Sequence, residues 1–394
     1  MPTENTSVHA RLPLGRLLAL AMAGFLAIMT ETLPAGLLPQ IGAGLAISES
    51  MAGQMVTLYA LGSVLAAIPV VAATRSMRRR PLLMAAIGTL LVFNSLTALS
   101  GHYGLTLVAR FAAGMAAGVV WGLLAGYARR MVAPQLQGRA LAVAGVGQPL
   151  ALAAGLPLGA WLGGLFDWRG VFWALSALCL LLLAWIRLGL PDCAGQPARQ
   201  RPPVARILAT PGVRPVLAVL FAWILAHNIL YTFIAPYLAS VGWGPRVDAV
   251  LLLFGLAAMA GIWFTGLLVD CWLRALTVLS LGLFALSAVV LGLAGQSTPA
   301  LLAGVAAWGL GFGGAPTLLQ TALADAAGEG ADVAQSMLVT VFNLAVAGGG
   351  VAGGWLLGWL GAPALPWALA LLALACLDES LPAAQAFVQA GAPW

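Results

Sequence analysis

Two side chains carry charge inside long apolar segments of this chain: the carboxylate of Glu31 and the guanidinium of Arg110. A charge at the centre of a membrane segment costs roughly 2.5–3.5 kcal/mol on insertion scales. Charged residues kept at that cost usually face the interior of a helix bundle or a wet pathway, where they can exchange a proton or bind a solute. Glu31 and Arg110 are therefore the first candidates for the chemistry of this protein.

The composition indicates which elements must position them. The 394-residue chain is 62% hydrophobic and only 8% charged, whereas soluble domains carry about 25% charged residues. Many apolar segments are about 20 residues long, which is the length a helix needs to cross a bilayer. Strands of a membrane barrel would instead alternate polar and apolar residues in segments of ~10 residues. The sequence predicts an all-α polytopic membrane protein.

Hydropathy predicts twelve transmembrane helices: 14–36, 51–74, 81–100, 104–127, 138–161, 170–189, 215–239, 247–270, 275–295, 298–322, 334–359 and 362–377. The first is too long for a signal peptide, so we expect it to be retained. The last is short because Asp378 and Glu379 end it. We expect an N-terminal six-helix bundle (1–189), a cytoplasmic linker (190–214) and a C-terminal six-helix bundle (215–394).

The arginines predict the orientation, because positive charge gathers on the cytoplasmic side. With the N-terminus inside, the outer face keeps only Arg169 and Arg246. The cytoplasmic connectors and ends collect Arg11, Arg16, Arg75, Arg78, Arg79, Arg80, Arg129, Arg130, Arg139, Arg187, Arg199, Arg201, Arg206, Arg214 and Arg274. Both termini are predicted to be cytoplasmic.

The two halves resemble each other at an offset of about 195 residues. Glu31 in span 1 corresponds to His227 and Asn228 in span 7, and Gln148 in span 5 corresponds to Asn343 in span 11. Two pseudo-symmetric six-helix bundles with a binding site between them at mid-depth are typical of alternating-access transporters.

Several connectors and spans carry recognisable motifs. These are Glu31-Thr-Leu-Pro34-Ala-Gly-Leu-Leu-Pro39, Arg75-Ser-Met-Arg78-Arg-Arg80-Pro-Leu-Leu, Arg110-Phe-Ala-Ala-Gly114 and Gly155-Leu-Pro157-Leu-Gly159-Ala-Trp-Leu-Gly163. Through them nearly the whole chain resembles the major facilitator superfamily, in particular the twelve-spanner drug:proton antiporters and their sugar-efflux branch. The resemblance implies the major facilitator fold. It also implies proton antiport through the span-5 antiporter motif of Gly155, Pro157, Gly159 and Gly163.

The gating loop departs from the pattern of that family. Arg75 stands where the family has Asp, and Arg78 stands at the second Gly. Arg79 belongs to the same loop, and the second-half copy keeps its usual form with Asp270 and Arg274.

Glu31 and Arg110 are predicted to lie at similar depth. At ~1.5 Å per residue, each lies roughly 8–9 Å from the outer end of its predicted span. In the superfamily fold both spans line the cavity, so we expect the two side chains to approach each other in at least one state. Desolvation favours the neutral acid and a neighbouring guanidinium favours the carboxylate, so separation of the pair would act as a proton switch. A fixed ion pair that orders the helices, or a substrate contact by Glu31, are the alternatives.

Other polar and aromatic residues in the spans are candidates for the substrate cavity. His227 titrates near neutral pH and could assist proton coupling, or it could line the cavity as a neutral group. The remaining cavity candidates are Tyr59, Trp121, Gln148, Asn228, Tyr231, Trp308, Gln320 and Asn343, with Phe233 and Phe342 as further aromatic residues. The amides could equally join helices, and the aromatic residues could equally be packing or interface residues.

The sequence argues against other classes. The net charge of +6 comes from dispersed arginines, which does not predict nucleic-acid binding, and the four cysteines have no metal-ligand spacing. Gly309-Leu-Gly-Phe-Gly-Gly314 lacks the strand-to-helix context of a nucleotide site. We predict no enzyme activity, no cofactor and no metal.

The function that these patterns favour is proton-coupled efflux of a small organic molecule, such as a drug, sugar or nucleoside, across the bacterial inner membrane. The expected partners are this substrate, protons and the lipid bilayer, and we expect a monomer. An importer or facilitator on the same fold is the first alternative, and a non-transporting membrane receptor is the second.

Overall fold

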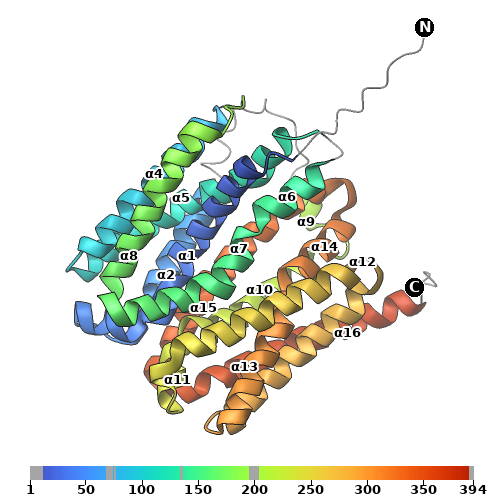
Figure 1. The fold of residues 1–394 in the computed structure, drawn as a ribbon. Coiled ribbons are helices and arrows are strands. Elements are labelled where there is room, and N and C mark those ends of the chain that lie inside the picture. The colour runs from blue at the N-terminus through green and yellow to red at the C-terminus, as the bar shows by residue number, and fades with distance from the viewer. Residues whose placement is uncertain (1–11, 68–73, 75–76, 134–135, 195–203, 390–394) are drawn as a thin grey trace.

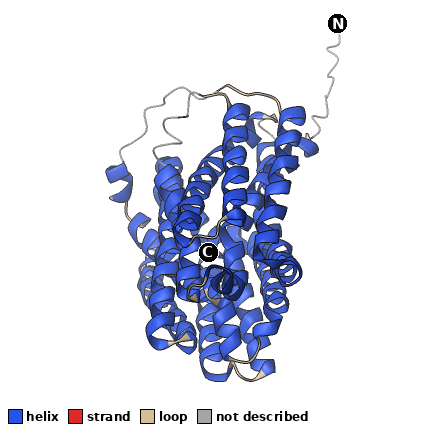
Figure 2. Cartoon of the chain, turned by 90° about the vertical axis from the view of Figure 1, so that its left-hand side faces the viewer, coloured by secondary structure: helices blue, strands red, loops and turns tan. Residues whose placement is uncertain are grey.

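The computed structural model describes residues 12–67, 74, 77–133, 136–194 and 204–389. This part of the chain is nearly all helical and contains no strand (Figure 2). The prediction of an all-α fold is confirmed.

The first half of the chain forms six spans. Four come from single elements: α1 (Leu14–Leu45), α2 (Glu49–Ala67), α4 (Arg79–Leu99) and α5 (Tyr103–Arg130). The fifth and sixth come from α6 (Gln137–Gly145), α7 (Gly147–Leu150), a π-helix η2 (Ala151–Gly155) and α8 (Leu156–Gly189). The helix α8 bends at Asp167, whose φ of 65° is not helical, and so supplies parts of both spans.

The second half repeats this pattern. A short α9 (Val204–Leu208) precedes span 7, which consists of α10 (Val213–Thr232) and α11 (Ile234–Ser240). The turn η3 (Gly244–Arg246) leads into α12 (Val247–Ala294), which bends at Trp272 and supplies spans 8 and 9. The remaining elements are α13 (Thr298–Gly313), α14 (Ala315–Ala327), η4 (Gly328–Gly330), α15 (Ala331–Leu360), η5 (Ala362–Ala364) and α16 (Leu365–Gln389).

Within the described residues, nine stretches are long and apolar enough to cross a membrane. One of them, Arg139–Gly189, contains two spans, and α2 and the shorter apolar helix Ala362–Leu377 complete the twelve. Two predicted ends were wrong. The helix α1 continues to Leu45 instead of ending at 36, because Pro34 and Pro39 are accommodated inside it. The helix α16 continues past Asp378 and Glu379 to Gln389.

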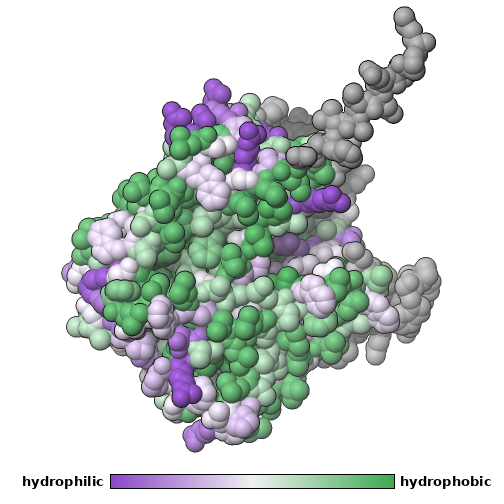
Figure 3. Space-filling view, in the orientation of Figure 1, coloured by the Kyte–Doolittle hydropathy of each residue, from purple (hydrophilic) through white to green (hydrophobic). Residues whose placement is uncertain are grey.

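The elements α1–α8 and α10–α16 form two neighbouring groups of helices (Figure 1). The helix α2 packs against α15 across the boundary, and α8 and η2 pack against α12. Most of the face in Figure 3 is hydrophobic, and hydrophilic residues gather mainly near the ends of the helices. We call the end with the α2–α4 and α5–α6 connections the arginine-rich end, and the other the opposite end.

The break in span 5 has a local cause. Pro157 has no N–H, so the helix cannot keep its regular hydrogen-bond pattern just before it. The N–H of Leu156 donates to the carbonyl of Ala151, five residues back, which is the π-helical pattern. The carbonyl of Leu152 is thereby left without its usual helical partner, at a point where Gly255 of α12 packs closely.

Candidate functional site

Arg110 of α5 is fully buried, with an exposed fraction of 0%, and its side chain contacts α1, α2 and α8. Its Nη2 donates to the carbonyl oxygens of Thr30 and, at 3.4 Å, Glu31, while its Nε donates to the carbonyl of Met55 at 3.4 Å. The guanidinium also lies 4.8 Å from the ring centroid of Tyr59. Dipoles and a π-face, not a carboxylate, therefore surround most of this charge.

One nitrogen of that guanidinium takes no part in these hydrogen bonds. Nη1 of Arg110 is buried and has no hydrogen-bond partner in the part of the chain that the structure describes. A buried donor without a partner is costly, and it costs more on a charged group. This nitrogen is available to an acceptor that is not in contact with it in this conformation.

Glu31 lies beside Arg110 without pairing with it. Its side chain is 7% exposed, and the described part of the chain offers its carboxyl group no hydrogen bond and no ion pair within 4.0 Å. The predicted equal depth of the two residues is nevertheless found, because Arg110 bonds the backbone of Thr30 and Glu31. The predicted distance from the outer end was wrong for Glu31, since α1 is longer than expected.

Four aromatic rings of the second half surround His227. Its imidazole lies 3.6 Å from the ring of Phe312 at an interplanar angle of 4°, and 4.8 Å from Tyr231. Phe254 and Trp308 lie at 5.8 and 5.4 Å, and Trp308 Nε1 donates to His227 Nδ1 at 3.2 Å. We call His227, Tyr231, Phe254, Trp308 and Phe312 the aromatic cluster.

The aromatic cluster and Glu31 lie at similar height on facing helices. Gly36 of α1 contacts Leu251 of α12, where a Cβ on the glycine would lie 3.3 Å from the leucine. Toward the arginine-rich end, Glu31 lies five residues from Gly36 along α1, and Phe254 lies three residues from Leu251 along α12. At ~1.5 Å per residue these are roughly 7 and 4 Å. Glu31 and Arg110 in one half thus lie opposite the aromatic cluster in the other.

The other predicted cavity residues do not all join this site. Tyr59 lies inside the first half, where its hydroxyl donates to the carbonyl of Ala27 at 2.8 Å. Asn228 and Asn343 are buried and donate to carbonyls one turn back in their own helices. Phe233 is buried between α2 and α15, and Trp121 is half-buried beside Gly24. Of the remaining candidates, Gln148 and Phe342 are half-buried and Gln320 is exposed.

The glycines predicted as an antiporter motif face α1. A Cβ on Gly155, Gly159 or Gly163 would overlap, in order, the side chains of Met29, Leu33 and Leu37. Small residues at this spacing let two helices approach closely. Pro157 lies among them and causes the π-helix.

The described arginines of the first gating loop bond the start of the linker. Arg78 Nε lies 2.6 Å from Asp192 Oδ2, and Arg80 Nη1 donates to the carbonyl of Leu190 at 3.3 Å. The backbone N–H of Arg79 donates to the carbonyl of Cys193, and Tyr127 Oη donates to that of Pro191. The loop thus holds residues 190–193 against the first half.

The rest of the predicted gating set is only partly described. Arg75 and the side chain of Asp270 lie outside the described residues. Arg274 is half-buried, and its Nη2 has no partner in the described part of the chain.

The two halves are in direct contact toward the opposite end. Ser50 Oγ donates to the carbonyl of Gly354 at 2.8 Å, and Gln54 Nε2 donates to that of Gly350 at 3.2 Å. The ring of Phe233 fits against Gly53 and Gly353. On the other side, Figure 3 shows a recess between the two groups of helices toward the arginine-rich end, with hydrophilic residues in it. The conformation is closed at the opposite end.

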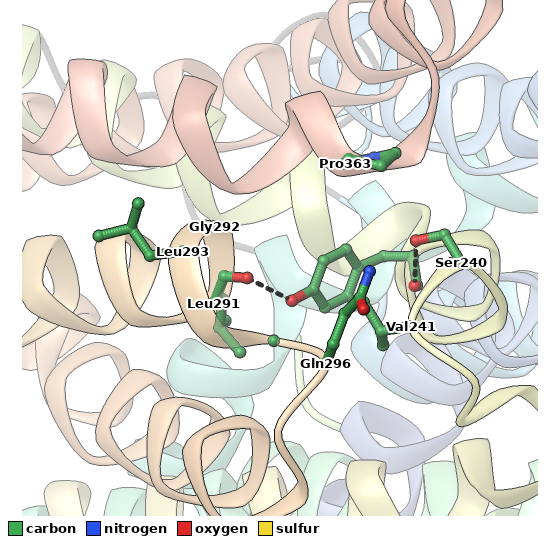
Figure 4. A pocket seen from close by; sticks show the side chains of 9 residues that line it. Ser240, Val241, Leu291, Gly292, Leu293, Gln296 and Pro363 are labelled. Atoms are coloured by element: carbon green, nitrogen blue, oxygen red, sulfur yellow. Dashed lines mark hydrogen bonds between the residues drawn. The ribbon is translucent and has the colours of Figure 1, made fainter.

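A separate hollow lies at the opposite end between α11, α12 and η5 (Figure 4). Tyr237 in its wall donates its hydroxyl to the carbonyl of Leu291 at 2.8 Å. Its lining carries no charged side chain. It does not contain Arg110, Glu31 or any member of the aromatic cluster.

Sequence reasoning missed several residues of the site. Phe254 and Phe312 complete the aromatic cluster, and Asn94 fixes Thr30 through a hydrogen bond of 3.0 Å between the side chains. Asn94 gave a signal, since it is a lone amide inside an apolar span. Phe254 and Phe312 gave none, because a Phe in a span is ordinary.

Comparison with known proteins adds family and fold. Residues 20–331 match the model of the Major Facilitator Superfamily. The purine ribonucleoside efflux pump NepI of Escherichia coli O157:H7 is 32% identical over 337 residues, 85% of each chain, and NepI of Shigella dysenteriae serotype 1 is 31% identical over the same share. The human organic anion transporter MFSD10 (TETRAN) superposes with a TM-score of 0.69 at 17% identity, covering 93% of this chain and 99% of its own.

Proposed function

This chain belongs to the major facilitator superfamily, and we propose that it is a proton-coupled antiporter that exports purine nucleosides by alternating access. Membership makes it a multi-pass membrane transporter and not an enzyme. The export direction and the substrate class are taken from the NepI relatives, which are purine ribonucleoside efflux pumps. Drugs and sugars, the other predicted substrate classes, are not part of this proposal.

One observation carries the proton coupling. Within the described part of the chain, the buried carboxyl group of Glu31 lies next to a buried guanidinium but forms no hydrogen bond or ion pair with it or with any other group, while Arg110 keeps an unused N–H. An ionised carboxylate in this place would be drawn to that N–H, whereas a neutral acid need not be. The conformation therefore fits a protonated Glu31. A small movement that brings the carboxyl group to Nη1 would favour the carboxylate and release the proton.

The transport cycle follows from these two states. Substrate binds between the halves while Glu31 is ionised and paired with Arg110, and it leaves on the other side as a proton takes its place on Glu31. The two halves, residues 1–189 and 215–394, move about the site, and the linker 190–214 connects them. The gating arginines and the closely packed glycines of span 5 hold elements of the first half together, so that this half moves as a unit.

For the orientation, the positive-inside rule places the arginine-rich end and both termini in the cytoplasm of a bacterium. The recess between the halves then opens to the cytoplasm. From this state, release of the proton from Glu31 to the cytoplasm allows a substrate to bind for export. The proposed unit is a monomer.

The test is transport in vesicles of the purified protein with tritiated guanosine outside and an acidic lumen. An antiporter accumulates guanosine as protons leave, whereas a proton-linked importer accumulates it when the outside is acidic. A facilitator accumulates guanosine under neither pH gradient, and a receptor binds guanosine without transporting it. Glu31→Gln is expected to lower the accumulation at least about tenfold.

The matched control is Glu49→Gln, a half-buried carboxyl group at the start of α2. It should transport like the unchanged protein. Because the carboxyl group of Glu31 has no partner among the described residues, Glu31→Gln should also keep its thermal stability. If Glu31→Gln still accumulated guanosine against the same gradient, Glu31 would not carry the proton.

A further inference from the structure

The aromatic cluster contains two polar groups that the protein itself does not satisfy. The first is Tyr231 Oη, which is buried and has no hydrogen-bond partner among the described residues, on a residue only 3% exposed. The second is Nε2 of His227, which forms no hydrogen bond within the described part of the chain. A buried polar group without a partner, such as Tyr231 Oη, is rare in native proteins and calls for an explanation. A bound ligand would supply both partners.

The hydrogen bond from Trp308 fixes the tautomer of the neutral His227 imidazole. An indole N–H can only donate, so Nδ1 of His227 must accept. In the neutral ring the proton is then on Nε2, which becomes a donor. Phe312 lies parallel against the face of the ring, and this leaves the edge, where the N–H points, free of the stack.

The tyrosine hydroxyl has a different capability. A phenolic hydroxyl can both donate and accept a hydrogen bond. The aromatic cluster therefore offers one fixed donor and one adaptable group, among rings that favour a flat aromatic ligand. Stacking of a nucleobase on such rings is sequence-tolerant, since every base has a π-face.

Purines match this pair of groups along one edge. Adenine and guanine both carry an acceptor at N7, next to an amino donor in adenine and a carbonyl acceptor in guanine. A fixed donor meets N7 in both, and a hydroxyl that can accept or donate meets either neighbouring group. Pyrimidines have no N7.

We propose that the aromatic cluster is the base-binding subsite, where Nε2–H of His227 donates to purine N7 and the hydroxyl of Tyr231 pairs with the group at position 6. This inference rests on the proposed function and adds to it the edge by which the base is read. His227 then acts as a specificity-determining residue in its neutral form, with Trp308 as the residue that sets its tautomer.

The experiment compares guanosine with 7-deazaguanosine, in which N7 is replaced by C–H. Binding of both is measured by calorimetry on the purified full-length protein, and transport in the same vesicles. The unchanged protein should bind 7-deazaguanosine about tenfold more weakly, the loss expected for one hydrogen bond. Uridine should bind more weakly still.

The variant His227→Phe keeps an aromatic ring but removes the donor. It should bind guanosine about as weakly as the unchanged protein binds 7-deazaguanosine, and it should no longer distinguish the two. Trp308→Phe removes the hydrogen bond to Nδ1 and should reduce the preference for guanosine over 7-deazaguanosine to about threefold. It serves as a second variant in case His227→Phe folds poorly. Thermal unfolding reports on folding.

The outcomes separate this inference from the proposed function. Guanosine transport together with equal binding of the two nucleosides by the unchanged protein overturns the N7 contact and leaves the function standing. If folded His227→Phe loses affinity equally for guanosine and 7-deazaguanosine, His227 is a packing residue, and this result also overturns the N7 contact. Absence of nucleoside transport in the unchanged protein overturns the proposed function itself.

Discussion

Arg110 shows how a buried charge is held without a counterion in contact. Its hydrogen bonds reach carbonyls in α1 and α2, and the rings of Tyr59 and Phe172 lie 4.8 and 5.7 Å from it. Those carbonyls belong to helices, so the guanidinium also joins α1, α2 and α5. One residue thus has a structural part and an unused N–H for the proposed proton switch.

Substitution of Arg110 by lysine tests both the structural role and the transport role. Lysine keeps the charge but lacks the planar guanidinium, whose several N–H groups can bond carbonyls on two helices and, in the proposed switch, the carboxylate of Glu31. Arg110→Lys is expected to lower the free energy of unfolding by about 2 kcal/mol, from lost charge-assisted hydrogen bonds, and to lower gradient-driven transport at least about tenfold. Thermal unfolding in detergent and the vesicle assay measure these effects. The surface variant Arg187→Lys should change neither, and normal transport by Arg110→Lys would argue against a specific role for the guanidinium.

At the scale of elements, α1 is packed against the fifth span along a row of glycines. The approach is closest at Gly147, where a Cβ would overlap the carbonyl oxygen of Ala21 and approach the nitrogen of Phe25 at 2.9 Å. Backbone atoms cannot turn aside as a side chain can. Since α1 carries Glu31, the fit of these helices also sets the position of the proposed proton carrier.

Two neighbouring glycines allow a matched test of this packing. Gly147→Ala should lower the free energy of unfolding by roughly 1–3 kcal/mol, because the helices must move apart. Gly145→Ala, two residues away, meets no atom within 4 Å and should be neutral or slightly stabilising. Thermal unfolding of both variants in one detergent gives the comparison. Equal stability of the two would mean that the helix contact is looser than described.

At the scale of the whole molecule, the halves touch toward the opposite end and part toward the arginine-rich end. The contact between α2 and α15 places Ser50 and Gly354 together, since a Cβ on Gly354 would lie 3.0 Å from Ser50 Oγ. This separation suits a disulfide, in which the Cβ of one cysteine lies near the sulfur of the other. Alternating access requires the contact to open once in each cycle.

A cysteine pair can hold the contact closed. In a background without the four native cysteines, the double variant Ser50→Cys with Gly354→Cys should lose transport, at least about tenfold, on oxidation and regain it on reduction. Each single variant should transport under both conditions. Undiminished transport by the cross-linked protein would show that the halves need not separate there.

The sequence alone determined the class of this protein and the location of its buried charges. Twenty-residue apolar segments require membrane helices whatever their packing, so the all-helical twelve-span fold was predictable, as was family membership from local motifs. Glu31 and Arg110 were identifiable because charges in such segments are rare. Helix ends were less predictable, since α1 tolerates Pro34 and Pro39 and continues to Leu45.

Only the tertiary structure decided which of these groups touch. It directed Arg110 to backbone carbonyls instead of the carboxylate of Glu31, directed Arg78 to Asp192, and gathered Phe254 and Phe312 around His227. Hydropathy fixes how deep a residue lies but not the direction in which it faces. That direction depends on how the helices rotate and pack, and packing is a property of the whole fold.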